Sequence, residues 1–356
     1  MFNSRLKVAL AFNVKPESES FSPIVPPFLN PAEATQKKSV DTYAEWDTWE
    51  TISAVKKALE EFNDVQMIEA DENAFEKFRQ SEVDIVFNIA EGMNGISREA
   101  QIPAMLDMLK IPYTGSDPLT LATCLDKSRT KEILSYYKIP NSPFRLIEDL
   151  SQLKNIKLNF PLIVKPISEG SSKGIFSSSF VSNQKELNDE VERILKEYNQ
   201  PALVEEFLPG KEFTVAILGN DQEAMALPIV EINYSEFPEN IVPIYSFEAK
   251  WILDTKENPL NVFTCPAAVD KITEEKIKST ALNAFKVLHC KDWSRVDIRM
   301  NSHNEPNVIE INPLPGILPN PEENSCYPKA ARTAGLNYNE MINKVLLAAA
   351  RRYKLL

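Results

Sequence analysis

The sequence predicts an α/β (α+β) protein with more than one lobe, on three observations. Its 356 residues exceed the ~100–200 residues that one domain usually contains. Short apolar segments, typical of strands, alternate with segments whose apolar residues recur every three or four positions, as in amphipathic helices. The alternation changes to a mixed pattern near residue 120, which indicates a second, smaller lobe.

The first third of the chain has the alternation typical of a parallel α/β sheet. The expected elements are a strand at 6–12, a helix at 49–62, strands at 65–70 and 83–90, and a helix that ends before Ile111. Residues 13–42 are rich in Pro, Ser and Asn, and they predict a long irregular surface loop.

The second lobe is expected to be a small α+β unit. Its elements are a helix at 126–137, a strand at 161–165, a helix at 184–198, and strands at 202–208 and 212–218. The rest of the chain predicts a loop at 246–266, a helix at 274–288, strands at 294–300 and 307–313, and a helix at 338–353.

Composition argues against several classes of protein. The 39 basic and 51 acidic side chains give a formal net charge of −12, which repels nucleic-acid phosphates and anionic lipids. No apolar run approaches the roughly 18 residues that a membrane span needs. Four cysteines lie far apart, and the two histidines follow no zinc-ligand spacing. We therefore expect no nucleic-acid partner, no membrane association and a reducing, cytoplasmic location.

One candidate phosphate-binding segment is PLIVKPISEGSSKG, at 161–174. It places Lys165 at the end of an apolar strand, before a loop of small residues whose backbone N–H groups can surround phosphate oxygens. The spacing of a Walker loop is absent, so a solvated lysine beside a Ser/Gly turn is the more common interpretation of this segment alone.

A candidate metal site lies on two strands near the C-terminus. The segments SRVDIRM and NVIEINP contribute Asp297, Glu310 and Asn312, and the last two share a face because side chains repeat every two residues along a strand. Oxygen ligands of this kind suit Mg²⁺. Taken alone, the pattern is more often a solvated face.

Three carboxylates and two apolar residues form a candidate base and ribose site. Glu205, Glu206 and Glu212 can accept hydrogen bonds from an adenine amino group or ribose hydroxyls, while Phe207 and Leu208 cover the base. An ordinary edge hairpin explains the same alternation equally well.

The sequence argues against covalent catalysis. Cys265, Ser171 and Ser172 are candidate nucleophiles, but neither histidine lies in a segment that could supply their base. Lys127 and Lys250, taken singly, are ordinary helix or loop lysines.

Eight segments, in this order, resemble the D-alanine–D-alanine ligase branch of the ATP-grasp enzymes over nearly the whole chain. They are VDIVFNIAEG, LKIPYTGSDPLTLATCLDKSRTK, FPLIVKPISEGSSKGI, LVEEFLPGKEFTVAILGN, FEAKW with its loop to TCPA, SRVDIRM, VIEINPLPG and YPKAARTAGLNY. The resemblance implies a three-lobed ATP-grasp fold. Its lobes would be an N-terminal α/β lobe at 1–120, a small central lobe at 121–215 and a C-terminal catalytic lobe at 216–356.

The resemblance also implies a nucleotide held between two lobes. Lys127 and Lys165 resemble the family's paired ATP-contacting lysines, and Glu205 through Leu208 resemble its adenine strip. Glu212 is similar to the ribose acceptor, and Lys250 to the lysine of a mobile loop that closes over the phosphates.

The implied catalytic groups lie on the C-terminal strands. Asp297, Glu310 and Asn312 are similar to the ligands of two Mg²⁺ ions, with Glu310 bridging. Arg295 resembles the arginine that stabilises the acyl phosphate and the tetrahedral intermediate. The backbone N–H of Gly316 is a candidate donor to the developing oxyanion.

The N-terminal substrate loop departs from the family. A glycine pair followed by a serine and acidic run is missing, and the 13–42 segment stands in its place. Glu45 or Asp47 could supply the lost carboxylate, although a helix-capping stretch is an equally good interpretation. Glu91, with the glycine after it, replaces the family's frequent histidine-glycine and adds a carboxylate near the substrate.

Two further departures concern specificity. Ser171 keeps its place, but the tyrosine that would partner it is Trp251, so that hydroxyl relay is lost. The serine-bearing segment that grips the second D-alanine is replaced by 313–326, where Asn320 and Ser325 could rebuild a carboxylate site or serve a different amine.

We therefore expect an ATP-dependent carboxylate–amine ligase in which an acyl phosphate is captured by an amine, releasing ADP and phosphate. Its substrates would be small and amino-acid-like, either D-alanine for the cell wall or another amino acid or peptide of a specialised route. A nucleotide-binding module without turnover is the alternative from another class. Many relatives pair through the N-terminal lobe, so a homodimer is also considered.

Overall fold

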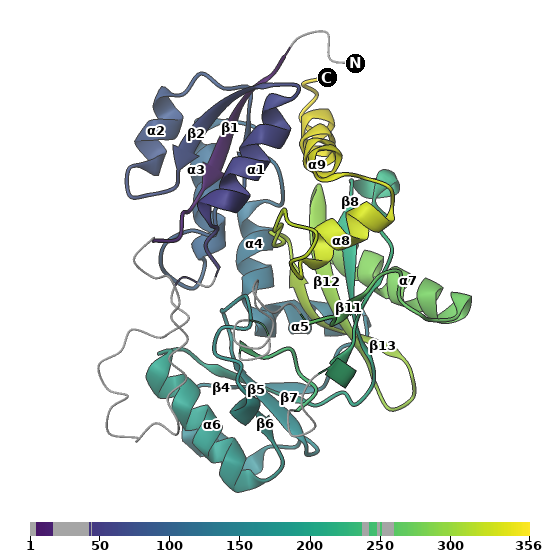
Figure 1. The fold of residues 1–356 in the computed structure, drawn as a ribbon. Coiled ribbons are helices and arrows are strands. Elements are labelled where there is room, and N and C mark those ends of the chain that lie inside the picture. The colour runs from purple at the N-terminus through teal and green to yellow at the C-terminus, as the bar shows by residue number, and fades with distance from the viewer. Residues whose placement is uncertain (1–4, 17–42, 44, 237–241, 248–249, 251–259) are drawn as a thin grey trace.

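The computed structural model describes residues 5–16, 43, 45–236, 242–247, 250 and 260–356. Their strands form three sheets, and helices pack against these sheets (Figure 1). The helices are α1 (Trp49–Glu60), α2 (Ala74–Gln80), α3 (Gln101–Leu109), α4 (Pro118–Leu125), α5 (Lys127–Tyr136), α6 (Gln184–Glu197), α7 (Lys271–Val287), α8 (Cys326–Thr333) and α9 (Tyr338–Arg352). The strands are β1 (Lys7–Phe12), β2 (Asp64–Glu69), β3 (Ile85–Asn88), β4 (Phe144–Ile147), β5 (Leu162–Pro166), β6 (Phe180–Val181), β7 (Ala202–Glu206), β8 (Glu212–Leu218), β9 (Met225–Ala226), β10 (Val230–Ile232), β11 (Phe263–Thr264), β12 (Trp293–Met300) and β13 (Pro306–Asn312).

The N-terminal sheet has the order β2-β1-β3, and β1 pairs in parallel with both neighbours, as the sequence predicted. Alternate residues of β1 enter different cores. Leu10 packs with α1 and α9, whereas Ala9 and Ala11 pack with α2 and α3. Because both faces are covered, β1 is apolar without interruption from Val8 to Phe12. The C-terminal helix α9 lies beside α1, and Asn343 donates to the carbonyl of Ala58 at 2.7 Å (Figure 1).

The central sheet has the antiparallel order β4-β7-β5-β6. Helix α6 covers one face of it and buries Leu187, Val191 and Ile194 against Leu162 and Val204 (Figure 1). The spacing of the three α6 residues, four and then three positions apart, is what places them on one side of the helix.

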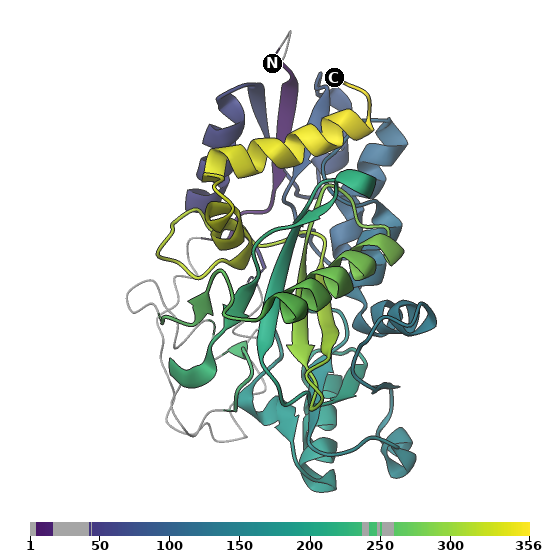
Figure 2. The same cartoon turned by 90° about the vertical axis from the view of Figure 1, so that its right-hand side faces the viewer.

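The C-terminal sheet follows the order β11-β10-β8-β12-β13, with β9 paired to β8. Helix α7 runs across one face of this sheet (Figure 2). There it buries Phe285 and Ala281 against Val215, Val296 and Ile298. The other face of β8, β12 and β13 is therefore left for the neighbouring lobes and for the site described below.

The expectation that residues 212–218 belong to the central lobe is wrong. β8 pairs with β10 and β12, and β7 pairs with β4 and β5, so the two strands form no hairpin. The connection between them crosses from the central sheet to the C-terminal sheet. At its start, Phe207 N–H donates to the carbonyl of Pro161, just before β5, and at its end Gly210 N–H donates to the carbonyl of Met300, in β12. The expected lobe boundaries at 120 and 215 accordingly fall inside α4 and β8.

The other expected helix and strand positions agree with the structure to within a few residues. The largest helix difference is α7, which begins at Lys271 because Asp270 caps it by accepting from the N–H groups of Ile272 and Thr273. The predicted loop 13–42 falls largely outside the described residues. Among those described, no helix has both the length and the apolar character to cross a membrane.

Asp292 connects the N-terminal lobe, the C-terminal sheet and α9. It is fully buried, and its carboxylate accepts from Gly115 N–H at 2.8 Å and from the side-chain amide of Asn220 at 2.7 Å. The guanidinium of Arg352, the last residue of α9, lies 2.7 Å from the same carboxylate. One buried charge thus fixes three segments that are distant in sequence.

We predict that Asp292→Asn lowers the free energy of unfolding by about 3 kcal/mol, because it leaves the Arg352 guanidinium without its carboxylate in a mostly buried site. Denaturant unfolding measures this change. Asp189→Asn is the matched control, since Asp189 pairs with Lys185 on an exposed helix face and should change stability by less than about 0.5 kcal/mol. Equal effects of the two substitutions would contradict the role given to Asp292.

Candidate active site

Strand β12 places three charged side chains on one face of the C-terminal sheet. Arg295, Asp297 and Arg299 alternate with Val296 and Ile298, which are fully buried under α7. Because successive side chains of a strand point to opposite faces, burial of the apolar pair requires the three charges to face the other way. Strand β12, between β8 and β13, thereby carries the polar row of the site.

Neighbouring strands complete a set of oxygen donors around Asp297. Asp297 lies directly opposite Glu310 on β13 and opposite Thr214 on β8, and Asn312 follows Glu310 on the same face. The hydroxyl of Thr214 donates to Oδ1 of Asp297 at 2.5 Å, and Arg295 donates to both Asp297 oxygens at 3.0 and 2.9 Å. The side-chain amide of Asn312 lies 3.3 Å from Oδ2 of Asp297.

This donor set fits a divalent cation. Within the described part of the chain no three His, Cys, Asp or Glu side chains form a metal cluster, so the set consists of two carboxylates and the amide of Asn312. Two carboxylates with a neutral oxygen donor are ligands that Mg²⁺ accepts, provided that phosphate oxygens and water fill the remaining positions. The residues predicted as metal ligands are therefore brought together.

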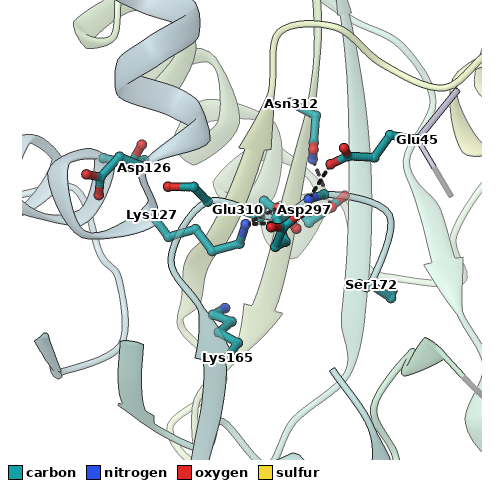
Figure 3. Close-up of polar contacts among 12 residues, drawn as sticks. Glu45, Asp126, Lys127, Lys165, Ser172, Asp297, Glu310 and Asn312 are labelled. Carbon is teal, nitrogen blue, oxygen red and sulfur yellow. Dashed lines mark hydrogen bonds and ion pairs between the residues drawn. The ribbon is translucent and has the colours of Figure 1, made fainter. Parts of the chain in front are cut away.

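Two lysines reach the same centre from other elements. Lys127 begins α5, whose N-cap is Asp126, and its ammonium group lies 3.1 Å from Oε1 of Glu310 and donates to the carbonyl of Glu169. Figure 3 shows Lys127 and Lys165 extending toward Glu310 and Asp297, while Glu45 points toward this centre from another side. Burial opposes the charge on Glu310, but Lys127, Lys165 and Arg295 outweigh it and hold the pKa of Glu310 below its ordinary value.

A second buried ion cluster lies on the central sheet. Glu205 pairs with Lys165 and also lies 2.9 Å from the ammonium group of Lys131, and all three side chains are nearly inaccessible. Burial alone would raise the pKa of Glu205, but the two lysines lower it to about 2. Burial lowers the pKa of Lys131, whereas Glu205 outweighs burial at Lys165 and raises its pKa.

The predicted ribose acceptor, Glu212, belongs to a third cluster. It lies opposite Arg299 across the β8–β12 pair, with 2.7 Å between them, and it accepts from the hydroxyl of Tyr234 at 2.8 Å. The Arg299 guanidinium lies 4.6 Å from the ring centre of Phe207, one of the predicted base-covering residues. These contacts fix the orientation of the Glu212 carboxylate.

Two adjoining cavities open onto these clusters. The inner cavity, of about 790 Å³, is lined by Lys127, Glu310 and Asn312 together with Asp47, Glu91 and Glu99. The outer cavity, of about 2180 Å³, is lined by Lys165, Asp297, Glu212 and the Glu205–Leu208 segment. The predicted catalytic residues Ser171, Lys250, Arg295 and Gly316 line both cavities.

The inner cavity has an acidic wall contributed by the N-terminal lobe. Burial raises the pKa of Asp47 to about 7, and burial with the neighbouring charge of Glu45 raises that of Glu99 to about 8. Burial, reinforced by Glu99, raises the pKa of Glu91 well above its ordinary value. Each of these carboxyls would be stabilised in its charged form by a cation in the cavity.

The C-terminal lobe contributes the positive side of the same cavity. Burial, together with the nearby Arg295, lowers the pKa of Lys250 to about 8. Burial opposes the charge of Arg295 as well, but Asp297 outweighs it and keeps the pKa of Arg295 above its ordinary value. The cavity therefore holds carboxyl groups from one lobe and cations from another.

The predicted substrate residues are placed differently from one another. Glu45 lines both cavities, but Arg98 and the N–H of Gly170 donate to its carboxylate. Ser325 lines the outer cavity, where its hydroxyl contacts the backbone of Gly316 and Leu318. The cavity linings do not include Asn320, whose side chain accepts from Glu322 N–H. Trp251 lies outside the described residues.

Comparison with known proteins identifies the family of this chain. A family model described as D-ala D-ala ligase C-terminus matches residues 133–347, more than half of the chain. A D-alanine–D-alanine ligase of Vesicomyosocius okutanii is 35% identical over 76% of this chain and 84% of its own length. The chain belongs to the D-alanine–D-alanine ligase family.

Other relatives agree with this assignment. A D-alanine–D-alanine ligase of Pelotomaculum thermopropionicum is 31% identical over 76% of the chain and 81% of its own length. The uncharacterized protein y4sG of Sinorhizobium fredii is 36% identical over 76% of the chain and 75% of its own length. The structure of a Bacillus anthracis D-alanine–D-alanine ligase complexed with ATP superposes with a TM-score of 0.70, at 20% identity and 99% coverage of both chains. The predicted family, ATP-grasp fold and ligase type of function are confirmed.

Sequence reasoning missed several residues that this D-alanine–D-alanine ligase family member brings to its site. Lys131 lies one helical turn after Lys127, and Arg299 lies two alternations after Arg295, so both shared a face with a predicted residue. That periodicity was an available signal. Arg98 carried no such signal, because its partners Glu45 and Ser168 are distant in sequence.

We predict that Glu205→Gln lowers the free energy of unfolding at pH 7 by about 3 kcal/mol, because two buried lysines lose their carboxylate. The pKa of Glu205 is lower in the folded state than in the unfolded state. Its contribution is therefore present above the unfolded value of ~4.3 and is lost as the pH falls toward about 2.

Chemical denaturation between pH 7 and pH 2 tests this prediction. Glu205→Gln should show a shallower loss of stability with falling pH than the unaltered protein. Glu132→Gln, which removes an exposed partner of Arg129, is the control and should leave the profile unchanged. Parallel profiles for the unaltered protein and Glu205→Gln would exclude the buried ion cluster.

Proposed function

We propose that this protein joins two amino-acid-like substrates through an amide bond, using ATP and Mg²⁺. The observation that carries the proposal is the division of charge in the inner cavity. Asp47, Glu91 and Glu99 come from the N-terminal lobe, and Lys250 and Arg295 come from the C-terminal lobe. A zwitterion has an ammonium group for the first set and a carboxylate for the second, so one molecule can satisfy both.

The outer cavity is the proposed nucleotide site. The Glu205–Leu208 segment would line the base, Glu212 would accept from ribose hydroxyls, and Lys127 and Lys165 would approach the phosphates. Lys165, Glu212 and the Glu205–Leu208 segment line the outer cavity, whereas Lys127 lines the inner cavity beside it. The γ-phosphate would then lie near the boundary, where Lys250 and Arg295 line both cavities.

The proposed reaction has two steps. A carboxylate oxygen of the first substrate attacks the γ-phosphorus, the bond to the β–γ bridging oxygen breaks, and ADP leaves. The amine of the second substrate, having lost a proton, attacks the acyl carbon, and phosphate leaves. Arg295 and Lys250 would neutralise charge on the moving phosphoryl group, and Gly316 N–H would donate to the developing oxyanion.

Asp297, Glu310 and Asn312 would hold Mg²⁺, and two ions are proposed from the resemblance. Bound Mg²⁺ would neutralise phosphate charge and keep the transferring group in line. Asp297 pairs with Arg295 and Glu310 pairs with Lys127. A bound cation would share these carboxylates with Arg295 and Lys127.

The identity of the substrates is the finer part of the proposal. D-Alanine with D-alanine is one candidate pair, and another amino acid or a peptide is the other, since Glu91, Trp251 and the 313–326 segment depart from the family pattern. A cytoplasmic location and a homodimer also stay proposals. The former is supported by four free cysteines, which suit a reducing compartment.

ADP release with Mg-ATP and a panel of single and paired D- and L-amino acids tests the function, with the product identified by its mass. We expect release that requires a carboxylate donor and an amine acceptor, with a product lighter than the two substrates together by one water. Tight ATP binding with no ADP release for any mixture would instead support a nucleotide-binding module.

We predict that Glu310→Gln lowers kcat by at least ~100-fold, because it removes the carboxylate shared by the metal site and Lys127. Steady-state ADP release at several Mg²⁺ concentrations measures the effect. Glu305→Gln, at an exposed pair with Lys276 on the turn before β13, should retain full activity. Near-normal turnover of Glu310→Gln would refute the metal assignment.

We predict that Glu91→Gln raises KM for the amino-acid substrate by about 10–100-fold, the range expected when one charged hydrogen bond is lost. KM for ATP should change less than about twofold, because Glu91 lines the inner cavity and not the outer one. Initial rates with each substrate varied in turn give both constants. A rise confined to KM for ATP would place Glu91 in the nucleotide site instead.

A further inference from the structure

We propose that Glu45 and Arg98 are positioning residues that fasten the loop 168–173 of the central sheet to the N-terminal lobe. This loop follows β5 and carries Ser171, which lines both cavities. The kinetic part of the proposal rests on the function proposed above. The structural part, that the pair holds the loop in place, can be tested on its own.

Arg98 makes three directed contacts from one guanidinium group. Its Nε and Nη2 atoms donate to the two oxygens of Glu45 at 3.0 and 2.5 Å, and its Nη1 atom donates to the carbonyl of Ser168 at 2.8 Å. The side chains of Arg98 and Glu45 are only 10% and 9% exposed. A guanidinium, unlike an ammonium group, can bind a carboxylate with one edge and a carbonyl with another.

Glu45 contacts the loop directly as well. Its Oε1 atom accepts from the N–H of Gly170 at 2.6 Å. A Cβ atom at Gly170 would lie 2.6 Å from that same oxygen, so a side chain at this position would displace the Glu45 carboxylate from this contact. The pair therefore binds one acceptor and one donor of the loop backbone, two residues apart.

Further contacts hold the rest of the loop. Glu169 accepts from the side-chain amide of Gln200 at 2.7 Å and lies 2.9 Å from the ammonium group of Lys173 within the loop. It also lies 3.6 Å from Nη2 of Arg98. Lys127 donates to the carbonyl of Glu169, and Ser172 donates to the carbonyl of Tyr245 at 2.8 Å. Glu45 and Arg98 thus supply the contacts from the N-terminal lobe to a loop that also touches the other lobes.

The position of this loop matters for the proposed reaction. Ser171 and Ser172 both have the left-handed backbone conformation, with φ of 51° and 60°, so their N–H groups point in directions fixed by the flanking residues. A displacement of about 1 Å at a reacting centre can cost roughly 100-fold in rate. The pair would therefore act on turnover through the loop, and the substrate ammonium would be left to Asp47, Glu91 and Glu99.

The test compares Glu45→Gln and Arg98→Lys with two control substitutions, Glu76→Gln and Arg79→Lys. Glu76 and Arg79 form a similar two-contact pair in the same lobe, but it is exposed. We expect Glu45→Gln and Arg98→Lys to lower kcat about 10–100-fold, with less than threefold change in KM for ATP. Amide hydrogen exchange in the loop 168–173 should become at least about tenfold faster, and the control substitutions should change neither quantity.

Exchanging the two residues separates positioning from simple charge pairing. The double variant Glu45→Arg with Arg98→Glu restores an ion pair, but a glutamate at 98 cannot donate to Ser168 and an arginine at 45 cannot accept from Gly170. We expect the thermal midpoint to recover while kcat and loop exchange do not. Recovery of all three would overturn the proposal.

Two other results would also overturn it. Unchanged loop exchange in Glu45→Gln, with a raised KM for the amino acid, would make Glu45 a substrate ligand. Activity and exchange both equal to those of the unaltered protein would give the pair no positioning role. Hydrogen exchange is measured without substrates, so it tests the loop contact even if the unaltered protein shows no turnover and the proposed function fails.

Discussion

The site depends on the burial of one face of β12. Val296 and Ile298 are driven under α7, and strand geometry then fixes Arg295, Asp297 and Arg299 on the opposite face. A shift of one residue in register would bury three charges and expose the apolar pair. The apolar core therefore determines where Arg295, Asp297 and Arg299 lie as directly as any polar contact does.

Burying so many charges together is stable only because opposite charges lie side by side. Glu205 lies between two lysines, Glu212 beside Arg299, Asp297 beside Arg295, and Glu310 beside Lys127. Each pair offsets a desolvation cost that a lone charge could not bear. The acidic wall of the inner cavity differs, since burial raises the pKa values of its carboxyls. This contrast distinguishes groups already paired in the protein from groups suited to meet a cationic part of a substrate.

Local patterns predicted much of this molecule, and long-range contacts account for the rest. The succession of strand and helix segments in the first third of the chain predicted the parallel sheet. Alternation along β13 predicted the shared face of Glu310 and Asn312. The place of β8 was not predictable from adjacency, because backbone bonds to Pro161 and Met300 decide where the chain crosses between sheets. Arg98 was missed for the same reason, since its role depends on contacts with Glu45 and with a loop that is distant in sequence.

The central claim is that one site activates a carboxylate as an acyl phosphate and then transfers it to an amine. Supplying the carboxylate donor with ¹⁸O in its carboxyl group, and analysing the released phosphate by mass, tests this most directly. The account predicts that each turnover moves one ¹⁸O atom from the substrate into inorganic phosphate. Release of ADP with unlabelled phosphate would mean that water attacks the γ-phosphate, which would contradict the ligase mechanism.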